Sequence, residues 1–122
     1  MTMPRKKIDR WRQILCYLVC KFPPPFPVEL VFNKGLDPGD IAESYELIKP
    51  GRRRIYILMD SRRTWRDGNH DLLHEYAHAM TWPVSKQQLE HHLPHLPEFW
   101  AAYGRIYVDF FDGDGAADSR DY

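Results

Sequence analysis

Two histidines and a glutamate stand at helical spacing in the segment LLHEYAHAM, residues 72–80. His74 and His78 are four residues apart, so on a helix both side chains project from one face with Cβ atoms about 5–6 Å apart. That separation lets each ring place a nitrogen about 2.0–2.1 Å from one zinc ion. Glu75 adjoins the first histidine and can reach a water at the ion to accept its proton. The spacing therefore predicts a metal site that activates water for hydrolysis, rather than a helix that happens to carry two histidines.

A catalytic zinc ion takes three protein ligands and keeps a fourth position open. The pattern that adds a histidine six residues after the motif, with a glycine between, is absent because Thr81 and Val84 occupy those places. Two later residues, His95 and Glu98, remain candidates for the third ligand, since a downstream glutamate also serves in some zinc peptidases. Glu98 is expected in the first turn of a helix that begins near Pro97, where backbone N–H groups already stabilise a carboxylate. The residues alone favour His95 and leave Glu98 as the alternative.

The segments HEYAHAM and HLPEFWAAYGRIY resemble the SprT-like zinc metallopeptidases and the short phage and bacterial proteins related to them. These proteins carry HExxH and then a His-Gly-Pro-Glu-Phe-like segment that opens the next helix. The resemblance covers roughly residues 53–111 and implies a minimal zincin-like fold, a Zn²⁺ cofactor and a cytoplasmic location, in the host if the chain is phage-encoded. Leu96 departs from the family's glycine, and no zinc ribbon follows. The residues that the resemblance assigns to the site are the metal ligands His74, His78 and His95 and the general base Glu75.

The surrounding elements predict one α+β domain over residues 1–111, with an N-terminal helix, a three-stranded sheet, the motif helix and a C-terminal helix. The first helix is expected at about residues 5–21, because apolar residues recur every three or four positions and the four prolines of FPPPFP end it. The same start has the basic lead and short apolar run of a signal peptide, but no small-residue cleavage site follows. Strands rich in β-branched and aromatic residues are expected at 28–32, 41–48 and 53–60.

A proline-glycine turn predicts that the second and third strands form a hairpin. The apolar run of the third strand is unbroken, which favours a strand covered on both faces. The motif helix is expected to begin at a cap on Asp67 or Asn69, with Asp71 in its first turn, and to end at Trp82 before a proline. Its expected inward stripe consists of Leu73, Ala77 and Met80.

A closing helix is expected from Pro97 to about Phe111. Tyr103 or Tyr107 can donate a hydrogen bond to a developing oxyanion, or can serve as a core aromatic. The last residues, 112–122, are poor in apolar side chains and predict a flexible acidic tail. The expected buried face of the closing helix consists of Phe99, Tyr103, Ile106, Tyr107 and Phe110.

Charge is spread unevenly along a chain whose 17 Lys/Arg and 17 Asp/Glu cancel. Residues 1–66 hold 14 Lys/Arg against 7 Asp/Glu, and residues 67–122 hold 3 against 10. The basic half, with tryptophans in RKKIDRWR and SRRTWR, is typical of a surface that contacts phosphates and stacks bases, or of solvated arginines. Cys16 and Cys20 form neither a CxxC pair nor a disulfide framework, which predicts a reducing compartment. No stretch approaches the roughly 20 apolar residues of a membrane-spanning helix.

Three functions are compatible with these patterns. The first is a zinc endopeptidase whose protein or peptide substrate pairs with a sheet edge, expected at the strand 53–60. The second is a DNA-associated protease of the SprT type that uses the basic half. The third is a non-catalytic interaction protein stapled by zinc, whose site a fourth ligand such as His91, His92 or Glu98 would close. Glu75 favours chemistry, because a structural staple has no use for a base beside its ligands.

Overall fold

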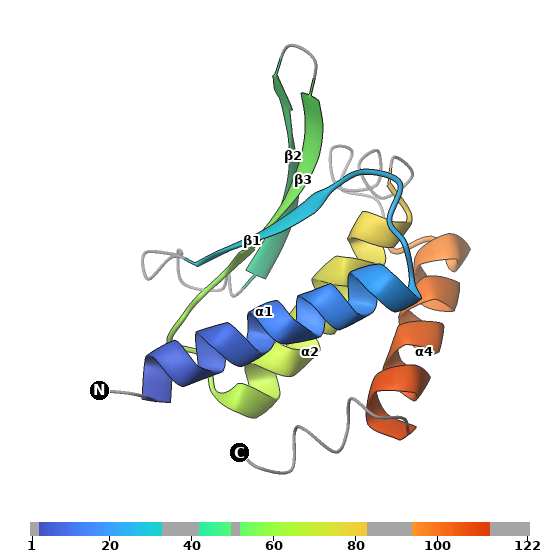
Figure 1. Cartoon of the computed structure of the whole chain (residues 1–122). Helices are drawn as coiled ribbons and strands as arrows, with labels where there is room; N and C mark the ends of the chain where they lie inside the picture. Colours follow the sequence, from blue (N-terminus) through green and yellow to red (C-terminus); the bar gives the residue numbers. More distant parts are fainter. Residues whose placement is uncertain (1–2, 33–41, 50–51, 83–93, 113–122) are drawn as a thin grey trace.

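The computed structural model describes residues 3–32, 42–49, 52–82 and 94–112. Its elements, drawn in Figure 1, are helix α1 (Met3–Lys21), strands β1 (Val28–Phe32), β2 (Ala42–Lys49) and β3 (Arg52–Met59), and helices α2 (Trp65–Met80) and α4 (Pro97–Asp112). The predicted α+β class is confirmed. The expected tail lies outside the described residues apart from Asp112, and so does most of the connection between α2 and α4.

β3 is the central strand of the sheet, which has the strand order β1-β3-β2. β1 runs parallel to β3, with Leu30 opposite Ile57. β2 runs antiparallel to β3, with Lys49 opposite Arg52, as a hairpin requires. The expectation that the third strand forms a sheet edge is therefore wrong, because β3 has a hydrogen-bonded neighbour on each side and β1 and β2 are the edges.

Side-chain burial alternates along β3. Ile55, Ile57 and Met59 are fully buried, whereas Tyr56 and Leu58 are only partly buried. The expectation of a strand covered on both faces is wrong for this reason. Successive side chains of a strand point to opposite faces, and α1 and α2 lie together on one side of the sheet (Figure 1). The unbroken apolar sequence thus reflects one core face and one partly covered face.

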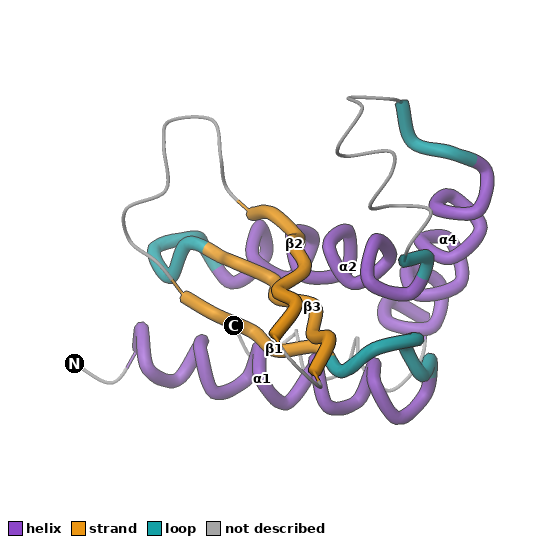
Figure 2. Tube along the Cα trace, turned by 90° about the horizontal axis from the view of Figure 1, so that it is seen from above, coloured by secondary structure: helices purple, strands orange, loops and turns teal. Residues whose placement is uncertain are grey.

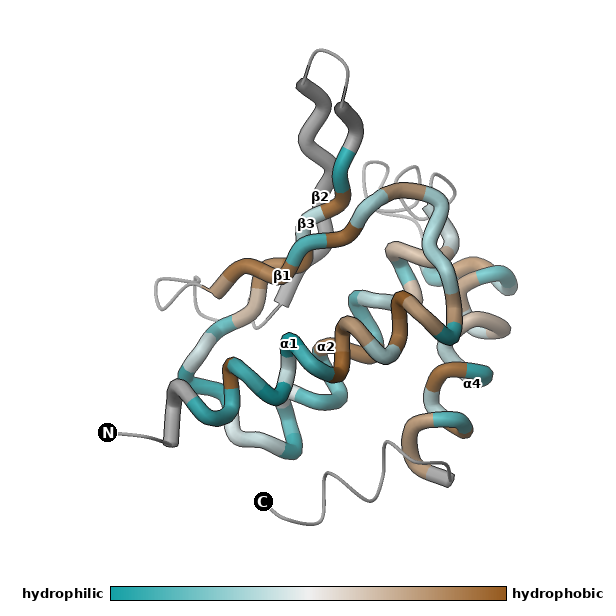
Figure 3. The backbone as a smooth tube through the Cα atoms, in the orientation of Figure 1, coloured by the Kyte–Doolittle hydropathy of each residue, from teal (hydrophilic) through white to brown (hydrophobic). Residues whose placement is uncertain are grey.

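α2 is the central helix, since it packs against β2, β3, α1 and α4. Seen from above, the strands overlie the region where α1 and α2 run side by side (Figure 2). α1 changes along its length from a mainly hydrophilic first half to a more hydrophobic second half (Figure 3). None of the described helices is long and apolar enough to cross a membrane. The largest fully buried side chains are Trp11, Tyr76, Phe99, Phe110, Leu18, Ile55, Ile57, Met59, Leu72, Leu73, Ile106 and His78.

The start of α2 is capped by Thr64, not by Asp67 or Asn69 as expected. Thr64 has an extended backbone, and its Oγ1 accepts a hydrogen bond from the Asp67 backbone N–H at 3.2 Å. Asp67 occupies the first turn, where a negative charge suits the helix dipole. Asn69 is buried, and its Oδ1 accepts a hydrogen bond of 3.0 Å from the Trp11 indole Nε1. The helix therefore begins earlier than its acidic residues indicated, at a threonine that ends the preceding arginine-rich turn.

Asp71 lies in the second turn of α2 and anchors this region to α1. Its carboxylate is buried and accepts a hydrogen bond from Arg63 Nε at 2.8 Å. Burial raises the pKa of Asp71, against the opposing effect of that hydrogen bond. The backbone carbonyl of Arg63 accepts a hydrogen bond from Lys7 Nζ at 2.8 Å. Arg63 thus connects two helices: its side chain binds Asp71 of α2, and its backbone carbonyl binds Lys7 of α1.

Trp11 fills the contact between α1 and α2. Its ring is fully buried and stacks on Phe32 and Trp65, with centroid distances of 5.9 and 6.1 Å. Gly68 of α2 lies directly under this ring, so that a Cβ atom placed there would stand 2.1 Å from Trp11 Cζ2. The close approach of the two helices therefore requires glycine at this position.

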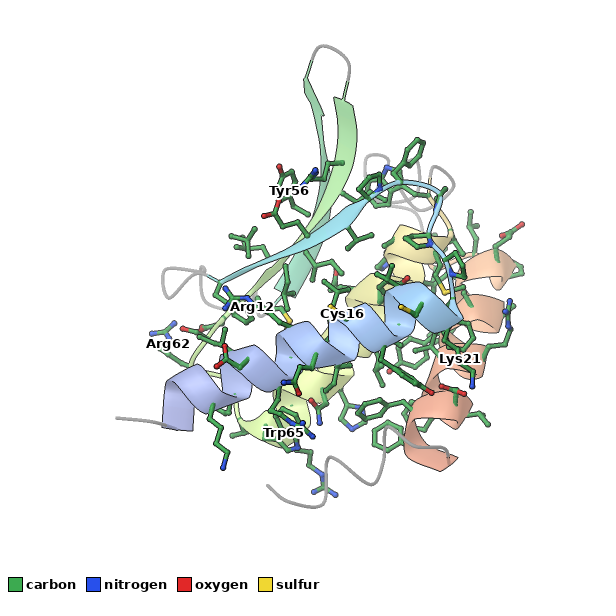
Figure 4. The ribbon with its side chains drawn as sticks, in the orientation of Figure 1. Arg12, Cys16, Lys21, Tyr56, Arg62 and Trp65 are labelled. Carbon is green, nitrogen blue, oxygen red and sulfur yellow. The ribbon has the colours of Figure 1, made fainter. Side chains whose placement is uncertain are left out.

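The second half of α1 holds α4 through polar contacts. The Tyr17 hydroxyl donates a hydrogen bond to Asp109, and Lys21 Nζ lies 3.1 Å from Asp109 Oδ1. Lys21 is labelled at the end of α1 nearest α4 in Figure 4. The Arg105 guanidinium lies over the Phe22 ring, 5.5 Å from its centroid. These contacts fix α4 on α1 as well as on α2.

Substituting Gly68 with alanine is expected to lower the free energy of unfolding by about 1–3 kcal/mol, because the added methyl group must displace the Trp11 ring. The matched control is Gly104→Ala in α4, where nothing lies within 4 Å of an added Cβ. That change is expected to raise the free energy by about 0.5–1 kcal/mol, since alanine favours a helix over glycine. Urea unfolding of the three proteins measures both effects. The same sign in both variants would contradict the close packing at Gly68.

Candidate metal centre

Three histidines converge at one place between α2 and α4. His74 and His78 project from neighbouring turns of α2, and His95 lies just before α4. One ring nitrogen from each residue can be chosen such that all three lie within 4.8 Å of one another. The three side chains are therefore close enough to bind one metal ion. This is the set that the resemblance assigned as ligands, and α2 and α4 bring it together from positions that are 21 residues apart at the extremes.

One pair of donors has the separation that a tetrahedral divalent ion requires. Two nitrogens bound about 2.0–2.1 Å from such an ion lie about 3.3–3.4 Å from each other. The Nε2 atoms of His78 and His95 are 3.3 Å apart. The same distance allows a hydrogen bond between two neutral rings when no cation is bound, because one ring then donates and the other accepts.

Burial keeps all three imidazoles neutral. Desolvation lowers the pKa of His78 to about 3, with further contributions from His74 and His95. The pKa of His74 is lowered to about 4, mainly by burial and then by His95. Burial also lowers the pKa of His95. At neutral pH the rings are uncharged, so a lone pair on each ring is available to a metal ion.

Phe99 forms the floor under the three histidines. Its ring is buried, and the centroid of this ring lies 5.0, 4.4 and 4.2 Å from the ring centroids of His74, His78 and His95. An aromatic side chain at this place limits the rotamers of all three rings and keeps water from their lower side. The sequence indicated that Phe99 is buried but not that it supports the ligands. Its position four residues after His95, one helical turn further on, could have indicated this contact.

Glu75 is buried beside the histidine group, with an exposed fraction of 7%. Its Oε2 lies 3.9 Å from His74 Nε2. The pair is not an ion pair at neutral pH, because the lowered pKa of His74 leaves that ring uncharged. The Glu75 carboxyl group thus lies beside the three converging histidine donors without being one of them.

Glu98, the alternative third ligand, is exposed in the first turn of α4 and does not belong to the converging group. Its position at a helix start explains this, since a carboxylate there interacts favourably with the free backbone N–H groups. His91 and His92 lie outside the described residues. Among the residues that the structure describes, the group thus consists of three histidine donors.

The two tyrosines proposed as oxyanion donors differ in position. The Tyr103 ring lies 5.8 Å from that of His74, and burial raises the pKa of its hydroxyl, which therefore stays protonated. Tyr107 instead contacts His70, with ring centroids 6.0 Å apart. Tyr107 is 38% exposed, so the expectation that it is a buried core residue is wrong. Only Tyr103 of this pair has a ring contact with the metal group among those that the structure describes.

Sequence reasoning missed His70. It stands four residues before His74, so it extends the stripe of His74 and His78 by one turn of α2. Its ring packs against Phe111 as well as Tyr107, with a centroid distance of 5.3 Å to Phe111. The repeated spacing of four residues could have revealed it. His70 does not join the converging donors, because it faces the far end of α4.

Comparisons of the chain with protein-family models, with curated proteins and with solved structures gave no match. The residues of the site alone therefore indicate its chemistry. Their arrangement can hold a divalent metal ion on three neutral nitrogens with a carboxylate alongside.

Replacing His95 with alanine is expected to weaken zinc binding by about 100-fold or more, since even groups that only support a ligand contribute 10–100-fold. The control is Glu98→Gln, which removes the charge of the rival ligand and is expected to leave the affinity unchanged. Competition titration against a chromophoric chelator measures both dissociation constants. A large loss in the Glu98 variant with none in the His95 variant would reverse the assignment.

The metal-free protein is expected to lose stability as the pH falls from about 6.5 toward 4. In this window the unfolded chain binds protons at histidines with an ordinary pKa of 6.5, whereas folded His74 and His78 stay neutral until about pH 4 and 3. The unfolded state binds more protons, so stability rises with pH and falls on acidification. Urea midpoints at several pH values measure the slope, which His74→Gln/His78→Gln should flatten. An unchanged slope in that variant would show that these rings are not the cause.

Proposed function

We propose that this protein is a zinc-dependent metallopeptidase of minimal zincin-like form, active in a single domain over residues 1–111. The observation that carries the proposal is the convergence of His74, His78 and His95 beside the buried carboxylate of Glu75. Three neutral imidazoles suit a borderline metal such as zinc, and three protein ligands leave a coordination position open. The order of strand, HExxH helix and second ligand-bearing segment supports the resemblance to SprT-like peptidases.

The residues of the chain divide the work of peptide hydrolysis. The ion, when bound, lowers the pKa of a water at its open position and polarises the substrate carbonyl. Glu75 accepts the proton of the attacking water and passes it to the leaving amine. Tyr103, whose hydroxyl is held protonated, donates a hydrogen bond to the developing oxyanion. Phe99 holds the ligand rings in place and keeps water from one side of the site.

The substrate backbone adds to an edge of the sheet in this proposal. Of the two edges, β2 is the one that packs against the motif helix α2. An extended peptide beside β2 would pair with the backbone groups on its outer edge. The proposed substrate-binding edge is therefore β2, in place of its neighbour β3, which the sequence had suggested and which lies inside the sheet.

The basic half of the chain does not strengthen a role on DNA. Several of its arginines have carboxylate partners within the protein: Arg62 pairs with Asp60 at 2.8 Å, and Arg54 lies 3.3 Å from Glu29. Arg63 hydrogen-bonds Asp71 as described above. Arg54, Arg62 and Arg63 therefore have structural roles within the protein. A zinc staple would need a fourth protein ligand, and the described residues offer three.

Glu75→Gln is expected to reduce hydrolysis of an unfolded protein substrate by about 10²–10⁴-fold, the usual contribution of a general base. Glutamine keeps the size of the side chain but cannot accept the proton of water. Glu98→Gln serves as the matched control and should retain activity. Both variants and the wild type are loaded with zinc, and their metal content is measured beside the cleavage rate. Equal cleavage by Glu75→Gln and wild type would exclude the proposed catalytic role.

A further inference from the structure

A row of aromatic side chains begins at the metal group and continues along α4. This aromatic ladder consists of Trp100, Tyr103, Tyr107 and Phe111. Successive ring centroids are 6.4, 6.0 and 4.4 Å apart. At its near end, Trp100 lies 5.3 Å from His95 and Tyr103 lies 5.8 Å from His74. The ladder is thus continuous with the site where a bond would be cleaved.

The ladder is open to solvent, yet it has a firm base. Trp100 is 57% exposed and Tyr107 is 38% exposed, whereas Tyr103 and Phe111 are partly buried. Tyr103 stacks on the buried Phe99 ring at 5.7 Å. At the far end, Tyr107 and Phe111 pack against His70 of α2. Rings held in this way present a surface that loses little conformational entropy when a ligand binds.

The charged residues in the middle of α4 point away from the ladder. Arg105 lies over the ring of Phe22, which directly follows α1, and Asp109 pairs with Lys21 at the end of that helix. The ladder side of α4 therefore carries uncharged rings in a chain of which 28% of the residues are charged. Such a surface matches apolar and aromatic side chains.

We propose that the aromatic ladder binds side chains of the polypeptide substrate next to the cleaved bond, and that it selects substrates with aromatic or large aliphatic residues there. Trp100 contacts the residue nearest the bond, and Tyr107 contacts one further along. The proposal rests on the proposed function for the place of the cleaved bond. It concerns the substrate's side chains, whereas the sheet edge concerns its backbone.

The exposed area suits a peptide better than a second copy of the chain. Aromatic side chains present about 150–250 Å² each, so the exposed fractions of Trp100 and Tyr107 leave on the order of 200 Å² on these two rings. A stable protein–protein interface buries about 800 Å² on each partner. Two or three apolar side chains of an extended peptide cover the smaller area.

The test measures binding apart from hydrolysis, in a zinc-loaded Glu75→Gln background. Two labelled peptides of equal length and charge are used, both rich in glycine and serine, one with phenylalanine and leucine flanking its central bond and the other with serine and threonine there. Fluorescence anisotropy is expected to show about tenfold tighter binding of the first peptide. Trp100→Ala or Tyr107→Ala should remove most of this preference. Both side chains are exposed enough that the variants keep their fold, which circular dichroism checks.

The matched control is Val108→Ala. Val108 is 57% exposed, like Trp100, but lies about 80° around the helix from Trp100 at 100° per residue. The Val108→Ala substitution should therefore leave peptide binding unchanged. Equal affinity for the two peptides, or an equal loss in the Val108 variant, would overturn the proposal. So would a dimer in sedimentation experiments that Trp100→Ala dissociates, since a second copy would then occupy the ladder.

Hydrolysis by the wild-type protein separates this proposal from the proposed function. Cleavage of both peptides at the same rate would overturn the selectivity of the ladder and leave the peptidase activity intact. Selective binding of the apolar peptide without cleavage would support the ladder as a polypeptide-binding surface and overturn the catalytic proposal.

Discussion

The packing of α4 against α2 determines whether a metal site exists at all. Helix geometry by itself brings His74 and His78 to one face, because they are one turn apart. His95 reaches them only because α4 begins beside α2, and the buried Phe99 ring is the contact that fixes this arrangement. A small shift of α4 would move the third donor without disturbing the first two. The metal group is therefore a tertiary feature built on a local motif.

The first helix stabilises this packing because it contacts both α2 and α4. Trp11 and Gly68 set how closely α1 approaches α2, while Tyr17 and Lys21 hold Asp109 of α4. α1 thus contacts both helices that carry ligands. The uneven charge of the sequence contributes to this packing, since Lys21 from the basic half pairs with Asp109 from the acidic half. Residues far from the metal group in sequence contribute to its geometry through this arrangement.

The features that the sequence predicted well depend on neighbours along the chain. Prolines follow the end of the first helix, β2 and β3 pair as a hairpin on either side of residues 50–51, and the HExxH spacing places two of the three converging histidines on one helix. The features it predicted wrongly depend on contacts between distant segments. Strand order placed β3 inside the sheet rather than at its edge, and helices on one face left Leu58 partly exposed. Both His95 and Glu98 flank the same helix start, and the sequence favoured His95 through the resemblance and through the stability of a carboxylate in a first helical turn.

Electrostatics gives the site its preference for a cation. His74 and His78 are buried as neutral rings that stay uncharged until well below neutral pH, and the Glu75 carboxyl group is buried beside them. The histidine lone pairs and the Glu75 carboxyl group thus lie in a poorly solvated region, and the removal of these polar groups from water is unfavourable. A divalent cation offsets this cost, since it attracts the donors and the carboxylate alike in a medium of low dielectric. Metal binding and the packing of α4 on α2 should therefore stabilise each other, because both bring His95 to the two histidines of α2.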